Sequence, residues 1–337
     1  MIDIAIDRFL SMSRHYTIFD VRSPGEFAQG HIPGAVNLPI VSDEERVVVG
    51  TLYKQRSEQD AYLKGLEIVG PKMAEFAQRA IEKARDKKIL IYCWRGGQRS
   101  GSMAWLFDLV GLKSYRLEGG YKAYRHYIAE TFSKPLPLVL IGGYTGTAKT
   151  EILLQMQKQG AQVIDLEGLA SHKGSVFGAI GMNDQPSYEN FEIALYNAIQ
   201  TFDLSIPIYI EDESRFVGKL QIPSSFFDQM KEAPRITIDK SRTARVKHLS
   251  SSYLSVSNDV LVEKVEAISK RLGSERSTIA IEAIQKGDFS TAIEQVLHYY
   301  DRAYQNTMDQ NSHEIGRIIE DDDQIIIDAI MKIEVFA

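Results

Sequence analysis

Cysteine is almost absent from this chain of 337 residues, which contains only one. A single cysteine excludes an internal disulfide and any metal site built from several cysteines, as is typical of a reducing compartment. Long uncharged apolar runs and a secretory signal pattern are also missing, so we expect a cytoplasmic protein without a membrane partner. A general excess of positive charge is missing too, because the formal net charge is −6. Any nucleic acid would therefore have to bind a local basic patch.

The hydrophobic content of 44% is sufficient for two domains with separate cores. Two closely spaced prolines, Pro135 and Pro137, fit neither a helix nor a central strand and predict a linker. We therefore expect α/β domains at residues 1–133 and 134–337, with a helical bundle at about 240–310 in the second.

The single cysteine, Cys93, ends a short apolar run that predicts a strand at residues 88–92. A glycine-containing loop follows, and a helical pattern begins at Ser100. Such a loop turns backbone N–H groups toward one point at the positive end of a helix dipole, which favours a thiolate and a bound anion. Arg95 and Arg99 add positive charge, so we predict Cys93, Arg95 and Arg99 as catalytic residues. The alternative is that Cys93 is a small buried hydrophobic side chain.

Three short motifs lie upstream of this loop: Asp20-Val21-Arg22, then Glu26-Phe27, then residues 30–39. Together they resemble the rhodanese domain. The resemblance implies a rhodanese-like α/β fold for the first domain, with Cys93 at the position of that family's sulfur-carrying cysteine. We interpret His31 as a structural residue that holds a turn.

The spacing from Cys93 to Arg99 differs from that of ordinary rhodaneses. Five residues separate the two, one more than in the usual sulfurtransferase loop. Cysteine phosphatases use this Cys-x5-Arg spacing to surround a phosphate. A wider loop suits a tetrahedral anion such as phosphate, selenophosphate or thiophosphate.

A second phosphate-binding pattern lies at residues 142–150, between an apolar run and a helical pattern. In this P-loop arrangement, backbone N–H groups surround a diphosphate, the lysine reaches its outer oxygens and the hydroxyl can bind Mg²⁺. Ala148 replaces the glycine that usually precedes the lysine. An acidic residue after a strand would complete the site, and we choose Asp212 over Glu211 and Glu213. The predicted diphosphate-binding residues are Gly143, Gly146, Lys149, Thr150 and Asp212, of which Thr150 and Asp212 are also the candidates for Mg²⁺.

Basic residues gather after a predicted strand at the start of the last third of the chain. They are Arg235, Lys240, Arg242, Arg245 and Lys247. We predict that they bind a tRNA or polyphosphate backbone, although such a run also fits a solvated surface.

Taken together, the two halves resemble the tRNA 2-selenouridine synthase family, a rhodanese domain followed by a P-loop NTPase-like domain. The residues that carry the resemblance are 43–55, 93–100, 165–175, 210–215 with Gly218, and 299–301 with Tyr304. The resemblance implies tRNA as a partner and a two-step exchange at its wobble base. Geranyl diphosphate first alkylates the sulfur of 2-thiouridine at the P-loop, and selenium from selenophosphate then replaces the S-geranyl group at the Cys93 loop. It also implies a selenophosphate-producing enzyme as a partner and, Mg²⁺ aside, no tightly bound cofactor.

Two other functions fit parts of the sequence. The Cys-x5-Arg spacing favours a cysteine phosphatase fused to a nucleotide-binding domain. The P-loop with the basic run favours an ATP-dependent RNA-binding module whose first domain is inert.

Overall fold

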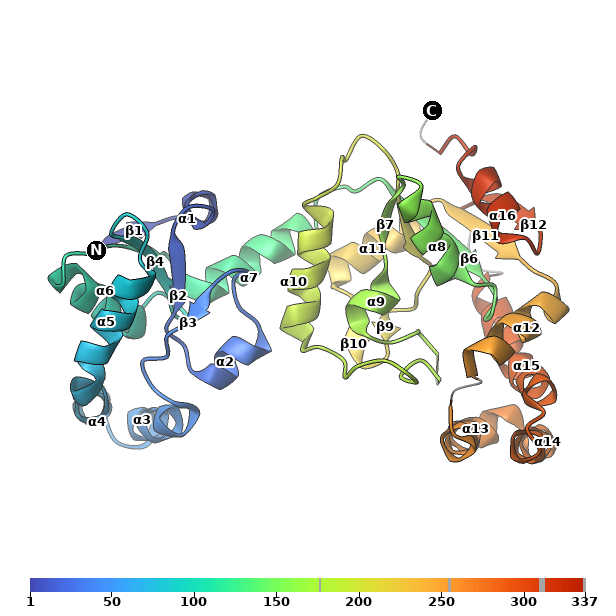
Figure 1. Cartoon of the computed structure of the whole chain (residues 1–337), viewed down its shortest axis with the longest axis horizontal. Helices are drawn as coiled ribbons and strands as arrows, with labels where there is room; N and C mark the ends of the chain where they lie inside the picture. The colour runs from blue at the N-terminus through green and yellow to red at the C-terminus, as the bar shows by residue number, and fades with distance from the viewer. Residues whose placement is uncertain (176, 254–255, 309–312, 336–337) are drawn as a thin grey trace. The chain divides into compact units, whose positions relative to one another are not determined.

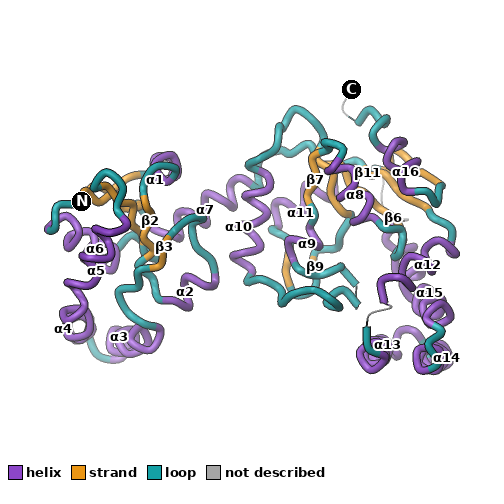
Figure 2. The backbone as a smooth tube through the Cα atoms, in the orientation of Figure 1, coloured by secondary structure: helices purple, strands orange, loops and turns teal. Residues whose placement is uncertain are grey.

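A computed structural model describes residues 1–175, 177–253, 256–308 and 313–335. The chain divides into two compact units, Met1–Thr131 and Phe132–Ala337, so that the division lies just before the predicted linker. In each unit, helices flank a parallel sheet (Figure 2), which is the α/β class predicted from the sequence. Among the described residues, none of the helices has the length and apolar character needed to cross a bilayer.

The sheet of the first unit has five parallel strands in the order β1-β5-β4-β2-β3 (Figure 1). The strands are β1 (Ile2–Ile4), β2 (Thr17–Asp20), β3 (Val36–Asn37), β4 (Lys88–Tyr92) and β5 (Lys113–Leu117). Central β4 is buried on both faces from Ile89 to Tyr92, which explains why its sequence is continuously apolar. Parallel strands place their carboxyl ends at one edge, so the residue after β4, Cys93, lies at that edge.

The helices of the first unit cover both faces of this sheet. They are α1 (Ile6–Ser13), α2 (Pro24–Gln29), α3 (Asp43–Gln55), α4 (Glu58–Val69), α5 (Met73–Lys83), α6 (Gln98–Leu109) and α7 (Gly120–Thr131), with a 3-10 turn η1 (Gly70–Lys72) before α5. Phe76 of α5 and Phe107 of α6 share a core cluster with Ile91. Phe9 of α1 contacts Tyr92 on the opposite face, because successive strand residues alternate. Ile81, by contrast, is 51% exposed and so lies on the outer side of α5.

The second unit contains another parallel sheet, in the order β12-β11-β6-β8-β7. Its strands are β6 (Leu138–Gly143), β7 (Gln162–Ile164), β8 (Ile208–Glu211), β11 (Arg235–Asp239) and β12 (Glu314–Ile319), beside a small antiparallel pair, β9 (Phe216–Val217) and β10 (Leu220–Gln221). Helices α8 (Lys149–Lys158) and α16 (Asp323–Ile330) pack their apolar faces on the sheet in one core cluster. The helices α9 (Leu166–Ala170), α10 (Tyr188–Ile199) and α11 (Ser224–Glu232) connect the other strands.

A helical bundle is inserted between β11 and β12 of this sheet (Figure 1). It comprises α12 (Arg242–Tyr253), α13 (Asn258–Leu272), α14 (Ser274–Gln285) and α15 (Phe289–Met308). The sequence predicted these helices but neither β12 nor the return of the chain to the sheet. Since β12 is largely exposed, it lacks the apolar pattern that identifies a buried strand.

Candidate functional site

The loop at Cys93 is held by the start of α7. Tyr121 N–H donates to Cys93 O at 2.8 Å, and Lys122 N–H donates to Trp94 O at 3.0 Å. In a trans peptide, the N–H points opposite to the C=O of the same peptide unit. The N–H groups of Trp94 and Arg95 share peptide units with the carbonyls that face α7, so these N–H groups face away from α7. The close packing requires glycine at position 120, where a Cβ would lie 2.3 Å from Cys93 O. The start of α7 thus fixes the carbonyl side of the loop and leaves its N–H side turned the other way, and the anion site there stays a prediction.

Cys93 is only 3% exposed, at the edge of the core cluster of the first unit. Its Sγ accepts a hydrogen bond from Ser100 Oγ at 3.2 Å, in the first turn of α6. The same hydroxyl also lies 3.3 Å from Gly97 O, between the loop and the sulfur. The sulfur thus combines little exposure with a hydrogen-bond partner in the first turn of a helix.

The arginines around this loop are not arranged as the sequence predicts. Arg95 is exposed, but Arg99 Nη1 donates to Glu26 Oε2 at 2.6 Å and is therefore held by α2. A further cation, Arg116 of β5, was missed by sequence reasoning. Asp3 holds its guanidinium at 2.7 and 2.8 Å, and Arg116 Nη1 lies 3.4 Å from Gly97 O. The bond with Asp3 is the main cause that raises the pKa of Arg116, and the charge of Cys93 contributes to it.

Residues beneath the loop have structural contacts. Arg22 and Asp20 form a fully buried ion pair at 2.6 Å, and the Arg22 guanidinium lies 3.8 Å from the centre of the Tyr121 ring. His31 Nδ1 lies 3.0 Å from Phe27 O and its ring stacks on Phe27, in agreement with a turn-holding role.

The P-loop of the second unit connects β6 to α8 as predicted. Gly143 and Gly146 have positive φ angles of 147° and 88°, and side chains there would clash with Ile238 O and Leu249. Lys149 Nζ donates to Gly143 O at 2.8 Å and so lies across the loop. The loop precedes the first turn of α8, where unsatisfied N–H groups and the helix dipole favour a phosphate.

Ala148 has a left-handed conformation, with φ 62° and ψ 35°. The usual glycine has this conformation at no steric cost, whereas an alanine is destabilised by about 1–2 kcal/mol. We expect Ala148→Gly to raise the free energy of unfolding by about 1 kcal/mol, as measured by urea denaturation of the full chain. A lower stability of the variant would show that the methyl group packs favourably enough to compensate.

Carboxylates line the P-loop, but each has a partner within the protein. Thr150 Oγ1 donates to Glu167 Oε2 at 2.7 Å, and Asp212 Oδ1 accepts from Arg235 Nη2 at 2.9 Å. Burial raises the pKa of Glu211 well above its usual range, and its Oε2 accepts from Leu166 N–H at 3.0 Å. Within the described residues, no group of three or more His, Cys, Asp or Glu side chains is arranged to hold a metal ion. The predicted Mg²⁺ pair, Thr150 and Asp212, is bonded to Glu167 and Arg235, respectively, and Mg²⁺ binding at this pair stays a prediction.

Glu213 gives the cleft a pH-dependent charge. Burial raises its pKa from 4.5 to about 7, Glu167 and Asp212 add to the shift, and Lys149 opposes it. The folded protein therefore keeps a proton that the unfolded chain loses above about pH 4.5, so stability falls as pH rises through this window. Since glutamine cannot ionise, the free energy of unfolding of Glu213→Gln should rise relative to wild type between pH 5 and 8, by at most about 3 kcal/mol. Urea titrations of both proteins at the two pH values measure this; a difference independent of pH would contradict it.

The P-loop residues line a cleft of about 380 Å³. Lys149, Thr150, Glu167, Asp212 and Glu213 all contribute to its wall, so the structure brings most of the predicted diphosphate-binding residues together. Lys173, from the loop after α9, adds a second lysine to this wall.

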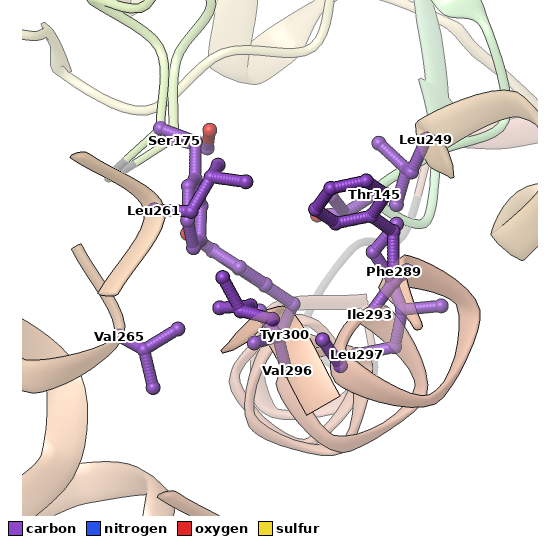
Figure 3. A pocket seen from close by; sticks show the side chains of 13 residues that line it. Thr145, Ser175, Leu249, Leu261, Val265, Phe289, Ile293, Val296, Leu297 and Tyr300 are labelled. Atoms are coloured by element: carbon purple, nitrogen blue, oxygen red, sulfur yellow. The ribbon is translucent and has the colours of Figure 1, made fainter. Parts of the chain in front are cut away.

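An apolar pocket in the helical bundle adjoins this cleft. Five residues line both spaces: Thr145, Ser175, Phe177, Leu249 and Tyr300. Figure 3 shows Leu261 and Val265 on one side of the pocket and Leu249, Phe289 and Ile293 on the other. The cleft suits the charged end of a ligand, and the apolar pocket, whose volume is about 40 Å³, suits part of a hydrocarbon end, the rest of which would need the lining side chains to move apart.

The basic run requires a correction, because three of its five side chains are buried. Arg235 pairs with Asp212, Lys240 with Asp323, and Arg245 with Asp301. Arg242 is partly exposed and also lies 3.5 Å from Asp301, whereas Lys247 is exposed. A buried, paired cation cannot release counterions from an RNA backbone, so the run is not one continuous RNA-binding surface.

Arg245 and Asp301 instead connect the bundle to the P-loop. Arg245 Nε donates to Thr145 O at 2.9 Å, and Asp301 of α15 holds the other end of the guanidinium. Asp301 belongs to the segment 299–301, which carries part of the family resemblance, so this contact gives that segment a structural role. The Tyr304 side chain lies outside the described residues. Segments 165–175 and 210–218 are also in contact. A Cβ at Gly218 would lie only 2.8 Å from the ring of His172.

The fold and both sites define a class: a rhodanese-like domain followed by a P-loop-type α/β domain. The family model of the rhodanese-like domain matches residues 6–127, and that of the tRNA 2-selenouridine synthase AAA domain matches residues 136–334. The chain belongs to the tRNA 2-selenouridine synthase family.

Relatives that carry this family name match along most of the chain. The tRNA 2-selenouridine synthase of Nitrosomonas europaea is 37% identical over 75% of this chain and 67% of its own. That of Sulfurovum sp. (strain NBC37-1) is 33% identical over 88% of this chain and 90% of its own. That of Pseudomonas putida is 36% identical over 85% and 86%, respectively.

Proposed function

We propose that the protein converts the wobble 2-thiouridine of tRNA to 2-selenouridine, by S-geranylation from geranyl diphosphate and then by selenium transfer from selenophosphate. Family membership supports the overall modification. The observation that carries the geranyl step is the junction of the P-loop cleft with the apolar pocket.

In the first step, the sulfur of 2-thiouridine attacks the first carbon of the geranyl group, and the carbon–oxygen bond to diphosphate breaks. Negative charge grows on the departing diphosphate. The loop amides and Lys149 are suited to stabilise this charge, because they are fixed before the reaction begins. The hydrocarbon chain extends toward Phe177, Leu249 and Tyr300, which line both spaces.

In the second step, selenium bonds to the base carbon and geranyl thiol leaves. Alkylation in the first step has made the sulfur a better leaving group. The selenium–phosphorus bond of selenophosphate breaks, and water takes the phosphoryl group. The Cys93 loop is suited to hold selenophosphate through its amides and Arg95, with the Cys93 sulfur beside the bound anion to direct selenium toward the base.

A cysteine phosphatase is less compatible with the geometry. It would need Arg99 to face the phosphate, but Glu26 holds the Arg99 guanidinium with two hydrogen bonds.

The decisive experiment is mass analysis of tRNA nucleosides after incubation with geranyl diphosphate and then with selenophosphate. The proposal requires S-geranyl-2-thiouridine after the first addition and 2-selenouridine after the second. Selenouridine formed without the geranylated nucleoside would contradict the two-step route. Hydrolysis of an aryl phosphate that depends on Cys93, without a modified nucleoside, would favour the phosphatase.

The apolar pocket can be tested separately with Ala292→Leu. Ala292 is buried in the pocket wall, so the larger side chain would fill the space. Geranyl transfer should fall about 10-fold or more relative to transfer from dimethylallyl diphosphate, whose chain is shorter, while inhibition by inorganic diphosphate stays unchanged. Ala267→Leu, at an exposed position of α13, is the matched control. An unchanged chain-length preference would place the geranyl group elsewhere.

A further inference from the structure

Helices α3 and α4 of the first unit lie side by side (Figure 1). They expose large apolar and aromatic side chains. Helix α3 has 13 residues, none of them buried, and α4 buries only Ala61. Tyr53 is 56% exposed, Tyr62 42% and Leu66 66%. Helices of a folded domain normally bury an apolar stripe, so an exposed one indicates a binding surface.

This surface borders the Cys93 loop. The side chain of Gln98, at the end of that loop, lies close to Tyr62, because a hydrogen bond between them acts on the pKa of Tyr62. Tyr53 lies near Tyr62, since it also contributes to that pKa. At the start of α3, Asp43 accepts from Gly25 N–H at 3.1 Å, which fixes α3 beside α2.

The charges at this border favour an anionic ligand. Arg99 and Arg46 both lie against Glu26, at 2.6 and 4.0 Å, so two cations share one acid, and Arg95 is exposed on the loop. The acids of the first turn of α3 have local partners: Glu45 pairs with Lys72 at 2.5 Å, and Glu44 accepts from Ser42 Oγ at 2.7 Å. The charge around the tyrosines is therefore mixed: the arginines lie on the side of the Cys93 loop, whereas Glu58 of α4 accepts a hydrogen bond from the Tyr62 hydroxyl at 2.6 Å.

Two glycines leave open space next to the tyrosines. Gly50 in α3 precedes Tyr53 by one turn, and Gly65 in α4 follows Tyr62 by one turn. A Cβ at either glycine would meet no atom within 4 Å, so packing within the unit does not require them. Glycine inside a helix is destabilising by up to about 1 kcal/mol relative to alanine. Their presence suits a surface that another molecule approaches closely.

We propose that Tyr53 and Tyr62 form a platform on which a base of the tRNA stacks when its wobble nucleotide enters the Cys93 loop. This inference rests on the proposed function, from which it takes the RNA ligand. Exposed aromatic rings bind unpaired bases by stacking, and nearby arginines bind the phosphates, as is common for single-stranded loops of RNA. A protein partner would need only the apolar part of this surface, whereas an anticodon loop uses the rings and the cations together.

The test is binding of the full chain to an anticodon stem-loop RNA with wobble 2-thiouridine, followed by fluorescence anisotropy at one fixed salt concentration. Tyr53→Ala and Tyr62→Ala should each weaken binding about 5- to 100-fold, because stacking on one ring is lost. Tyr53→Phe and Tyr62→Phe, which keep the ring, should stay within about twofold of wild type. Trp105→Ala is the matched control, because Trp105 is 57% exposed on α6 of the same unit. In the variant Tyr62→Trp, added RNA should quench tryptophan fluorescence more than it does in wild type, because the base would stack on the new tryptophan.

The possible failures are distinguishable. If the wild-type chain does not bind the RNA, the proposed function fails and this inference fails with it. If wild type binds and both alanine variants bind equally well, only the platform is overturned. A wild-type chain that sediments as a dimer and becomes a monomer in Tyr62→Ala would overturn it too, since a second copy would then cover the surface.

Discussion

Replacement of Lys149 by alanine is expected to lower geranyl transfer at least about 100-fold, the usual effect of removing one donor from a developing negative charge. Lys149 lines the P-loop cleft, and its ammonium lies across the loop at Gly143 O. Its charge should matter more for the departing diphosphate than for binding of geranyl diphosphate, so kcat should fall more than KM rises. The measurement is the rate of S-geranyl-2-thiouridine formation in tRNA.

Two comparisons make this prediction specific. Lys158→Ala, an exposed lysine at the end of the same helix, should have the wild-type rate. When tRNA is supplied already geranylated, Lys149→Ala should still incorporate selenium. A Lys149→Ala protein that geranylates normally but fails with geranylated tRNA would reverse the assignment of the two steps.

Sequence reasoning succeeded where the signal is local. At Cys93 and again at the P-loop, an apolar run, a glycine-containing loop and a helical pattern follow one another within about 20 residues, and the structure has a strand, a loop and a helix at both places. The left-handed conformation of Ala148 follows from the same local logic, because its position is the one at which the P-loop pattern requires glycine.

It failed where the partner lies far away along the chain. Arg235, Lys240 and Arg245 look like a basic surface in the sequence, but Asp212, Asp323 and Asp301 neutralise them in space. Their separations are 23, 83 and 56 residues, and no local pattern reports such pairs. Arg116 was missed for the same reason, since the parallel pairing of β1 with β5 brings Asp3 beside it.

These ion pairs change where RNA binding is expected. Of the predicted basic run, Lys247 and part of Arg242 remain accessible, which is few contacts for an RNA backbone. The first unit has the cations around the Cys93 loop and the exposed tyrosines of α3 and α4, a combination better suited to an anticodon loop. On the proposal above, the segment 43–55, which is among those that carry the family resemblance, contributes Tyr53 to the RNA-binding surface.

Cys93→Ser is expected to leave tRNA geranylated and to lower selenium incorporation at least about 100-fold, because a hydroxyl oxygen cannot replace the polarisable, ionisable sulfur that directs selenium to the base in the proposed second step. Serine is nearly isosteric and can keep the hydrogen bond with Ser100, so the core around α6 should remain intact and thermal unfolding should be unchanged. The substitution therefore tests the chemistry of the sulfur rather than its packing. Accumulation of S-geranyl-2-thiouridine with both substrates present is the diagnostic result. If Cys93→Ser also prevents geranylation, the first unit takes part in the first step; if selenium incorporation is unchanged, the sulfur only packs in the core and the amides of its loop alone direct selenophosphate.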